Sequence, residues 1–155
     1  MSDGIPRANF GHVQVTLPPP RMLPPTAAQS YLVVAEALTS SILVLAATQN
    51  IHPLGHTLLC GQALECILKA YLCGTLGPPR AQAFGHDIRA AWDASAAAGL
   101  PVSTPMPAWA ESLHVHHAKP YLGRYAQGLN GFVFGVTQDV TSGIVDVLKI
   151  VRPLV

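Results

Sequence analysis

The stretch LGHTLLCGQALECILKAYLC, residues 54–73, decides the fold that the sequence predicts. Its polar and glycine positions form one narrow stripe when they are placed on a helix: Thr57, Gly61, Gln62, Glu65 and Lys69. Leucine, isoleucine, alanine, tyrosine and cysteine occupy most of the remaining surface. A helix that is apolar over most of its circumference is buried among other elements. We expect it to end in the glycine- and proline-rich segment 74–79.

Four further segments carry apolar residues at every third or fourth position, which is the period of a helix. We predict helices over residues 26–49, 87–98, 108–118 and 137–150. Thr26 and Asp87 are suitable N-cap residues for two of them. The predicted fold class is therefore all-α, with a bundle of four to five helices in residues 26–155.

Residues 1–25 differ in composition from the rest of the chain. Segment 12–17 alternates polar and apolar side chains and could form a short strand. Five prolines follow between residues 18 and 25, and proline removes a helical hydrogen bond. We interpret residues 1–25 as an extended Pro-rich arm that packs on the body of the protein or on a neighbouring subunit.

The composition of the 155-residue chain limits the possible functions. Half of the residues are hydrophobic, 11% are charged and the net charge is +1. Such a chain is too apolar for bulk disorder, and it has too little positive charge for strong electrostatic binding of nucleic acid. So much apolar surface on few helices predicts a homodimer, in which a second subunit covers part of it.

The sequence does not predict a membrane protein. No charged residue occurs between Glu36 and Glu65, but polar residues and Pro53 interrupt this gap. The N-terminus lacks the order of regions found in a signal peptide. All three cysteines fall in segment 60–73, at spacings unsuited to a disulfide framework. We expect a cytoplasmic protein with reduced thiols and no membrane contact.

Several polar residues could carry chemistry. Glu65 and Lys69 are spaced i,i+4 on the apolar helix, so they could form a half-buried ion pair or line a cleft. Asp87 is explained by its place at a helix start. Arg124 could bind phosphate or carboxylate, or pair with Asp87 or Glu65 across the bundle.

The histidines raise the question of a metal site. His114, His116 and His117 cluster, and a metal-binding bundle that uses them is one hypothesis. No carboxylate or cysteine stands beside them at a ligand spacing, and the chain contains neither an H-E-x-x-H nor a C-x-x-C motif. We therefore predict no metal and no other cofactor.

A family resemblance follows from the order of four motifs. The helix QALECILKAYL (62–72) precedes the turn GHDI (85–88), a helix ending in AGL (98–100), and the segment YLGRY (121–125). In this order the residues resemble the HEPN-domain family, small all-α proteins of prokaryotic toxin–antitoxin and defence systems. The resemblance covers about residues 30–125. It implies an antiparallel helical bundle that dimerises through helix faces.

The resemblance also implies a possible activity. Catalytic HEPN proteins are metal-independent ribonucleases that carry an Arg, four to six residues and then a His. In this chain no histidine follows Arg124. Arg80 and His86 have five residues between them, but they flank a loop ahead of the third predicted helix, where the nuclease pair is not expected.

We therefore predict a non-catalytic HEPN-like dimer with a binding or scaffold role. Its ligand would be a nucleotide, RNA or a partner protein such as a nucleotidyltransferase-type antitoxin. The expected cleft residues are Glu65, Lys69, Asp87 and Tyr125. The alternative is a ribonuclease with a rearranged site, in which Arg124 acts with one of three histidines: His86, His116 or His117.

Overall fold

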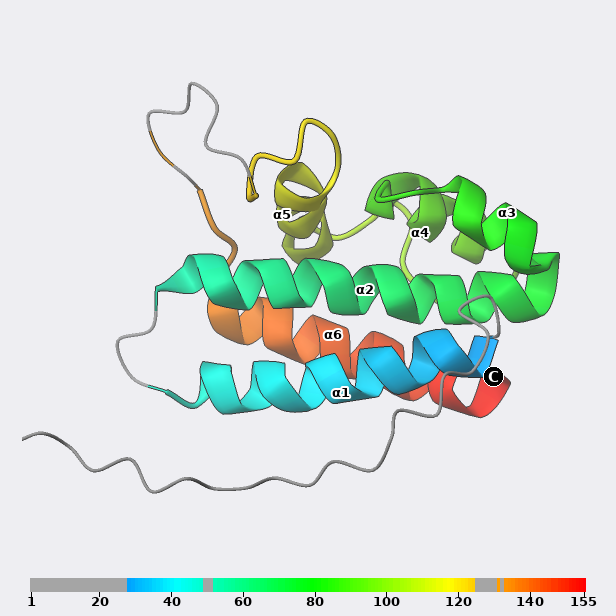
Figure 1. Ribbon diagram of the computed structural model, residues 1–155, viewed down its shortest axis with the longest axis horizontal. Coiled ribbons are helices and arrows are strands. Elements are labelled where there is room, and N and C mark those ends of the chain that lie inside the picture. The colour runs from blue at the N-terminus through cyan, green and yellow to red at the C-terminus, as the bar shows by residue number, and fades with distance from the viewer. Residues whose placement is uncertain (1–27, 49–51, 125–130, 132) are drawn as a thin grey trace, which may run out of the picture.

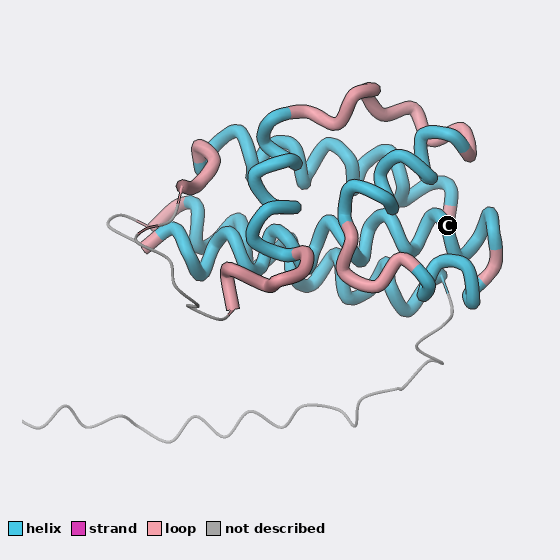
Figure 2. Tube along the Cα trace, turned by 90° about the horizontal axis from the view of Figure 1, so that it is seen from above, coloured by secondary structure: helices cyan, strands magenta, loops and turns pink. Residues whose placement is uncertain are grey.

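The computed structural model describes residues 28–48, 52–124, 131 and 133–155. In this part of the chain the regular structure is entirely helical (Figures 1 and 2). The elements are α1 (Ala28–Ala46), α2 (Pro53–Leu76), α3 (Pro78–Ala83), α4 (Ile88–Ala97), α5 (Ala108–His117), α6 (Thr137–Val151) and a final 3-10 turn, Arg152–Leu154. The all-α prediction is confirmed. The Pro-rich arm, residues 1–25, lies outside the described residues.

Helix α2 is the centre of the bundle. It packs against each of the other five α-helices. Figure 1 shows α1 antiparallel to both α2 and α6, whereas α2 and α6 run in the same direction. The expectation of an antiparallel arrangement therefore holds for α1 but not for the pair of α2 and α6. The short helices α3, α4 and α5 lie along the other side of α2.

The apolar surface of α2 explains its central place. Fourteen of its residues are buried, including Leu64, Ile67, Leu68 and Leu72. The prediction of a buried helix is confirmed, and its bounds differ from the predicted ones by at most three residues. Each buried leucine or isoleucine contributes about 1.5–3 kcal/mol to the folding free energy. This burial makes α2 the scaffold on which the other elements are placed.

Helix α3 was not predicted from the sequence. Segment 78–83 was expected to be a loop because it starts with two prolines, but it forms α3. Gly77 has a φ of 87°, which ends α2. Pro78 and Pro79 then occupy the first helical positions, where a missing N–H group removes no helical hydrogen bond. Proline therefore starts this helix instead of preventing it.

Helices α4, α5 and α6 meet around two tryptophans. The rings of Trp92 and Trp109 are edge to face, with centroids 5.9 Å apart. The indole of Trp109 lies directly on Gly143 of α6, where any Cβ atom would collide with it. A glycine at this position allows the first turn of α5 to approach α6 closely.

Helix α1 is the most exposed of the long helices. In the described part of the chain it is also the one helix long and apolar enough to span a membrane, and 17% of its most apolar window is buried. Its other face packs on α2 and α6 through Ala35, Thr39 and Ile42, which are buried. A helix in a water-soluble bundle can have the same length and composition as α1. The absence of membrane contact therefore stays a prediction.

Candidate functional site

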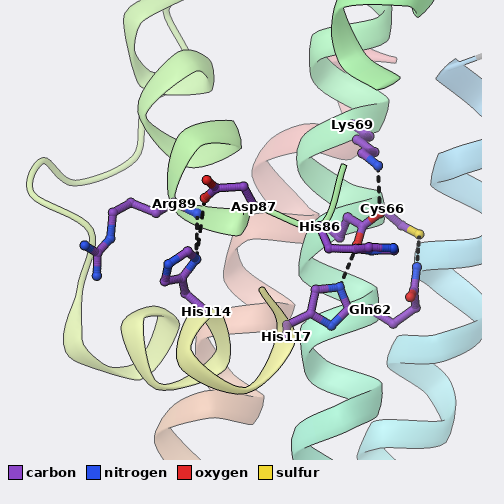
Figure 3. A network of polar contacts seen from close by, with 9 residues as sticks. Gln62, Cys66, Lys69, His86, Asp87, Arg89, His114 and His117 are labelled. Atoms are coloured by element: carbon purple, nitrogen blue, oxygen red, sulfur yellow. Dashed lines mark hydrogen bonds and ion pairs between the residues drawn. The ribbon is translucent and has the colours of Figure 1, made fainter. Parts of the chain in front are cut away.

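A buried glutamate joins three parts of the fold. The Oε1 atom of Glu65 accepts a hydrogen bond from Lys69 Nζ at 2.7 Å. Its Oε2 atom accepts two, from His86 Nδ1 at 2.8 Å and from His117 Nε2 at 2.6 Å. Figure 3 shows His86 and His117 converging on the same point of α2. We call Glu65, Lys69, His86 and His117 the Glu65 cluster.

Local sequence explains how each member reaches this point. Glu65 and Lys69 are one turn apart on α2 and share a face. His86 lies in the turn between α3 and α4, which Gly85 permits by adopting a φ of 56°. Asp87 then caps α4 by accepting a hydrogen bond from the backbone N–H of Ala90 at 3.0 Å. Residues 85–87, which were predicted as the start of a helix, therefore also direct the His86 side chain toward α2.

The Glu65 carboxylate is ionised despite its burial. Burial alone would raise the pKa of Glu65, but the hydrogen bonds from His117, Lys69 and His86 together lower it to about 2. Charge-assisted hydrogen bonds of this kind are stronger than neutral ones. The three hydrogen-bond donors therefore stabilise a negative charge that would be unfavourable if it were buried without them.

His117 is fully enclosed, and its ring has one free nitrogen. Its Nε2 atom binds Glu65, while its buried Nδ1 atom has no hydrogen-bond partner in the described part of the chain. That nitrogen faces α2 at Gly61, where a Cβ atom would lie 2.9 Å from it. A neutral ring protonated at Nε2 fits this environment, because a second proton on Nδ1 would be a buried donor without an acceptor.

A pocket opens beside the cluster. Its volume is about 480 Å³, within the usual range for small-molecule sites. The lining residues that carry aromatic, polar or charged groups are Phe84, His86, Asp87, His114, Lys119 and Tyr121. The side chain of His86 is 37% exposed, and its ring links the buried Glu65 to this pocket.

Tyr121 forms one wall of the pocket in an unusual backbone conformation. Its φ of 62° lies in the left-handed region, which is uncommon for a non-glycine residue. Its ring is edge to face with that of His86, with centroids 5.6 Å apart. The guanidinium of Arg124 lies 5.8 Å from the centre of the same ring. The Tyr121 ring therefore contacts both the His86 ring and the Arg124 guanidinium.

The cluster contains the ligand types of a metal site. Single ligand atoms of Glu65, His86 and His117 lie within 4.8 Å of one another. Two features of the described residues disfavour an ion there. Lys69 already balances the charge of Glu65, so a divalent ion would add two uncompensated charges. Coordination through His117 Nε2 would also move its proton to Nδ1, which has no acceptor.

The structure brings together some of the predicted site residues and separates others. Glu65, Lys69 and His86 meet in the cluster, and Asp87 lines the adjoining pocket. His116 points elsewhere: it stacks on Phe134, with ring centroids 5.2 Å apart, and donates to the Val133 carbonyl. Tyr125 lies outside the described residues.

One expected ion pair is not formed. Arg124 was a possible partner of Asp87 or Glu65, but it forms an ion pair with neither. The sequence predicted no carboxylate ligand beside His114, His116 and His117. In the structure Glu65, 52 residues from His117, supplies one to His117. No spacing within the sequence signals that contact. His114, in turn, lies 3.6 Å from the carboxylate of Asp87.

Comparison with known proteins adds no further assignment. No protein-family model, no curated protein and no solved structure matches this chain.

Proposed function

We propose that this protein is a non-catalytic, HEPN-like binding protein whose pocket takes a nucleotide, either free or as one unit of single-stranded RNA. One observation carries the proposal. A pocket of nucleotide size has aromatic walls at Phe84 and Tyr121 and a cation at Lys119, and Glu65 fixes the orientation of His86 beside them.

The lining residues match the parts of a nucleotide. Aromatic rings bind bases by stacking, which tolerates any base. Lys119 is exposed and offers a positive charge to a phosphate. Asp87 can accept hydrogen bonds from an amino group of a base. A single pocket with one lysine also suits a chain of net charge +1, because it needs no extended basic surface.

The arrangement of Arg124 supports binding over cleavage. Its guanidinium lies 5.8 Å from the centre of the Tyr121 ring, and Arg124 is not among the residues that line the pocket. Of the two histidines that line the pocket, His86 is bound to Glu65, and the Nδ1 atom of His114 accepts a hydrogen bond from the backbone N–H of Arg89. This arrangement supports a binding role, because Arg124 stands outside the pocket lining that contains His86.

Titration of purified protein with nucleoside monophosphates, followed by calorimetry, tests this function. A parallel titration of dye-labelled single-stranded RNA, followed by anisotropy, distinguishes a free nucleotide from a polymer. We expect Lys119→Ala and Tyr121→Leu each to weaken binding at least five-fold. Lys149→Ala, which removes an exposed lysine on α6, is the matched control and should bind normally. Equal binding by all variants, or none at millimolar ligand, would contradict the proposal.

One observation favours a second candidate, a metal-independent ribonuclease. A carboxylate bound to one nitrogen of a histidine orients the other nitrogen for proton transfer. Here Glu65 holds His86 Nδ1, and His86 Nε2 makes no hydrogen bond within the described residues. His86 could then act on the 2′-hydroxyl of a bound RNA, with Arg124 supporting the phosphate.

Incubation of end-labelled RNA with the protein in chelator separates the two candidates. Cleavage that is lost in both His86→Gln and Arg124→Ala, and kept in Arg80→Ala, would establish the ribonuclease. Arg80 is the matched control because it is exposed on α3 and is not among the residues that line the pocket. RNA binding without cleavage would support the binding protein instead.

A further inference from the structure

Two side chains in the pocket are held in place by α4 and still have polar atoms to offer to a ligand. Asp87 is the residue that precedes α4, and His114 belongs to α5. Both line the pocket beside the Glu65 cluster, and Figure 3 shows the His114 ring turned toward the start of α4. Their contacts with α4 determine which atoms remain for a ligand.

The Asp87 carboxylate offers an acceptor. Its Oδ1 atom accepts the hydrogen bond from the Ala90 N–H group that caps α4. Its Oδ2 atom accepts no hydrogen bond from the described residues, and 53% of the side chain is exposed, so a ligand can reach it. A carboxylate has about four lone-pair sites, of which the cap uses one. The cap therefore fixes the side chain and leaves most of its acceptor capacity unused.

The His114 ring offers a donor. Its Nδ1 atom accepts a hydrogen bond of 3.3 Å from the backbone N–H of Arg89, one of the first-turn groups that have no acceptor within α4. A nitrogen that accepts a hydrogen bond carries no proton, so the proton of the neutral ring is on Nε2. That N–H group makes no hydrogen bond within the described part of the chain.

The donor and the acceptor are neighbours but do not bind each other. His114 Nδ1 lies 3.6 Å from Asp87 Oδ1, which is too long for a hydrogen bond. Neither the Nε2–H group of His114 nor the Oδ2 atom of Asp87 is therefore used by the other residue. The pocket presents a donor next to a carboxylate.

A donor next to a carboxylate is complementary to the Watson–Crick edge of guanine. Guanine carries the O6 acceptor beside the N1–H and N2–H groups, so a carboxylate can accept from both N–H groups while a donor binds O6. Adenine and cytosine present a ring-nitrogen lone pair in the place of N1–H, and the carboxylate would repel it. Uracil keeps an N–H group there, but a carbonyl oxygen replaces the amino group.

From this complementarity we infer that the pocket selects guanine: Asp87 accepts from N1–H and the amino group, and His114 Nε2–H donates to O6. This inference rests on the proposed function and adds base specificity to it. Stacking on Phe84 and Tyr121 gives affinity without a choice of base. Asp87 and His114 provide the choice, because a wrong base leaves a polar group unpaired or facing a like charge.

Calorimetric titration of the full chain with the four nucleoside monophosphates tests the inference. Wild type should bind GMP about ten-fold more tightly than AMP, CMP or UMP. Inosine monophosphate, which lacks only the amino group of guanine, should bind with intermediate affinity. Equal affinity for GMP and AMP would overturn the inference but leave the proposed function intact. Absence of binding by all four at millimolar ligand would overturn both.

Two RNA octamers show whether the guanine is read in a free nucleotide or in a chain. One contains only adenosine, and the other has one central guanosine. Tighter binding of the second octamer than of GMP, followed by anisotropy, would assign the pocket to single-stranded RNA. Tighter binding of GMP than of either octamer would assign it to a free nucleotide. Guanine is selected in both outcomes, and a preference for the all-adenosine octamer would overturn the inference.

Asp87→Asn exchanges the acceptor for a donor without removing the helix cap. Asparagine caps a helix as well as aspartate does, so its oxygen can still bind the Ala90 N–H group while Nδ2 takes the place of Oδ2. The variant should lose about ten-fold in affinity for GMP and gain affinity for xanthosine monophosphate, in which a carbonyl oxygen replaces the amino group. A gain for a second ligand cannot result from poor folding.

Two further variants complete the test. Asp93→Asn, which neutralises an exposed carboxylate of α4 outside the pocket lining, is the matched control and should keep the preference for GMP. Lys119→Ala should weaken all four monophosphates by the same factor, because it removes a phosphate contact and no base contact. An Asp87→Asn variant that still prefers GMP to xanthosine monophosphate, as wild type should, would overturn the inference.

Discussion

His117 Nε2 donates a hydrogen bond of 2.6 Å to Glu65 Oε2, across 52 residues of sequence. This contact fastens the end of α5 to the centre of α2. It also occupies the same carboxylate oxygen that holds His86 at the pocket. The Glu65 side chain therefore holds both His86, which lines the pocket, and the C-terminal end of α5.

Removal of the Glu65 charge should destabilise the protein strongly. In Glu65→Gln the ammonium of Lys69, of which only 9% of the side chain is exposed, loses its counter-charge. Breaking a buried ion pair by removing one partner costs about 3–5 kcal/mol. Urea denaturation should show a loss of this size. The double variant Glu65→Leu and Lys69→Leu should be more stable than the single one, and the opposite order would contradict the argument.

Lowering the pH should remove the stabilisation that the ionised Glu65 carboxylate contributes to the fold. The pKa of Glu65 falls from an ordinary 4.5 to about 2 on folding, so the unfolded chain binds this proton more readily. Its contribution is fully present above pH 4.5 and disappears as the pH falls toward 2. The shift corresponds to about 3 kcal/mol. The stability difference between wild type and Glu65→Gln, measured in urea from pH 6 to pH 2.5, should therefore narrow with acid. A constant difference would show that Glu65 is not the titrating group.

A single methyl group at Gly61 should disturb the cluster. In Gly61→Ala the added Cβ would lie 2.9 Å from His117 Nδ1, so the imidazole must move away from α2. We expect a loss of about 1–3 kcal/mol, the usual effect of overpacking. Gly74→Ala is the matched control, since no atom lies within 4 Å of its Cβ. That variant should gain up to about 1 kcal/mol from helix propensity. Equal effects of the two substitutions in thermal denaturation would contradict this view of His117.

Lys69 should lower the affinity of the Glu65 cluster for metal ions. With the ammonium in place, we expect Zn²⁺ or Co²⁺ to bind weakly, because the charge of Glu65 is already neutralised. Lys69→Met removes that competing charge and should tighten binding at least ten-fold. Equilibrium dialysis measures the affinity, and the visible spectrum of Co²⁺ reports the ligand geometry. A double variant that also carries His117→Gln should lose the gain. Tight, stoichiometric binding by wild type would show that the cluster is a metal site.

The sequence predicted the helices well and the contacts between them poorly. The periodic apolar residues of α2, α4, α5 and α6 gave helix bounds within three residues of the structure. Helix α3 was missed because Pro78 and Pro79 indicate a break, whereas their effect depends on being first in the helix. Glu65 and Lys69 were recognised as an ion pair, and His86 as a separate candidate. Nothing in their spacing showed that His117 would complete the set.

The sequence by itself determined the fold class, because apolar periodicity and helix caps act over a few residues and need no knowledge of distant partners. It also determined that Glu65 and Lys69 face the same way, since i,i+4 residues share a face on any helix. Only the tertiary structure decided that His86 and His117 share one oxygen of Glu65. That meeting depends on the close approach of α5 to Gly61 of α2 and to Gly143 of α6, and side-chain packing, not local propensity, sets these distances.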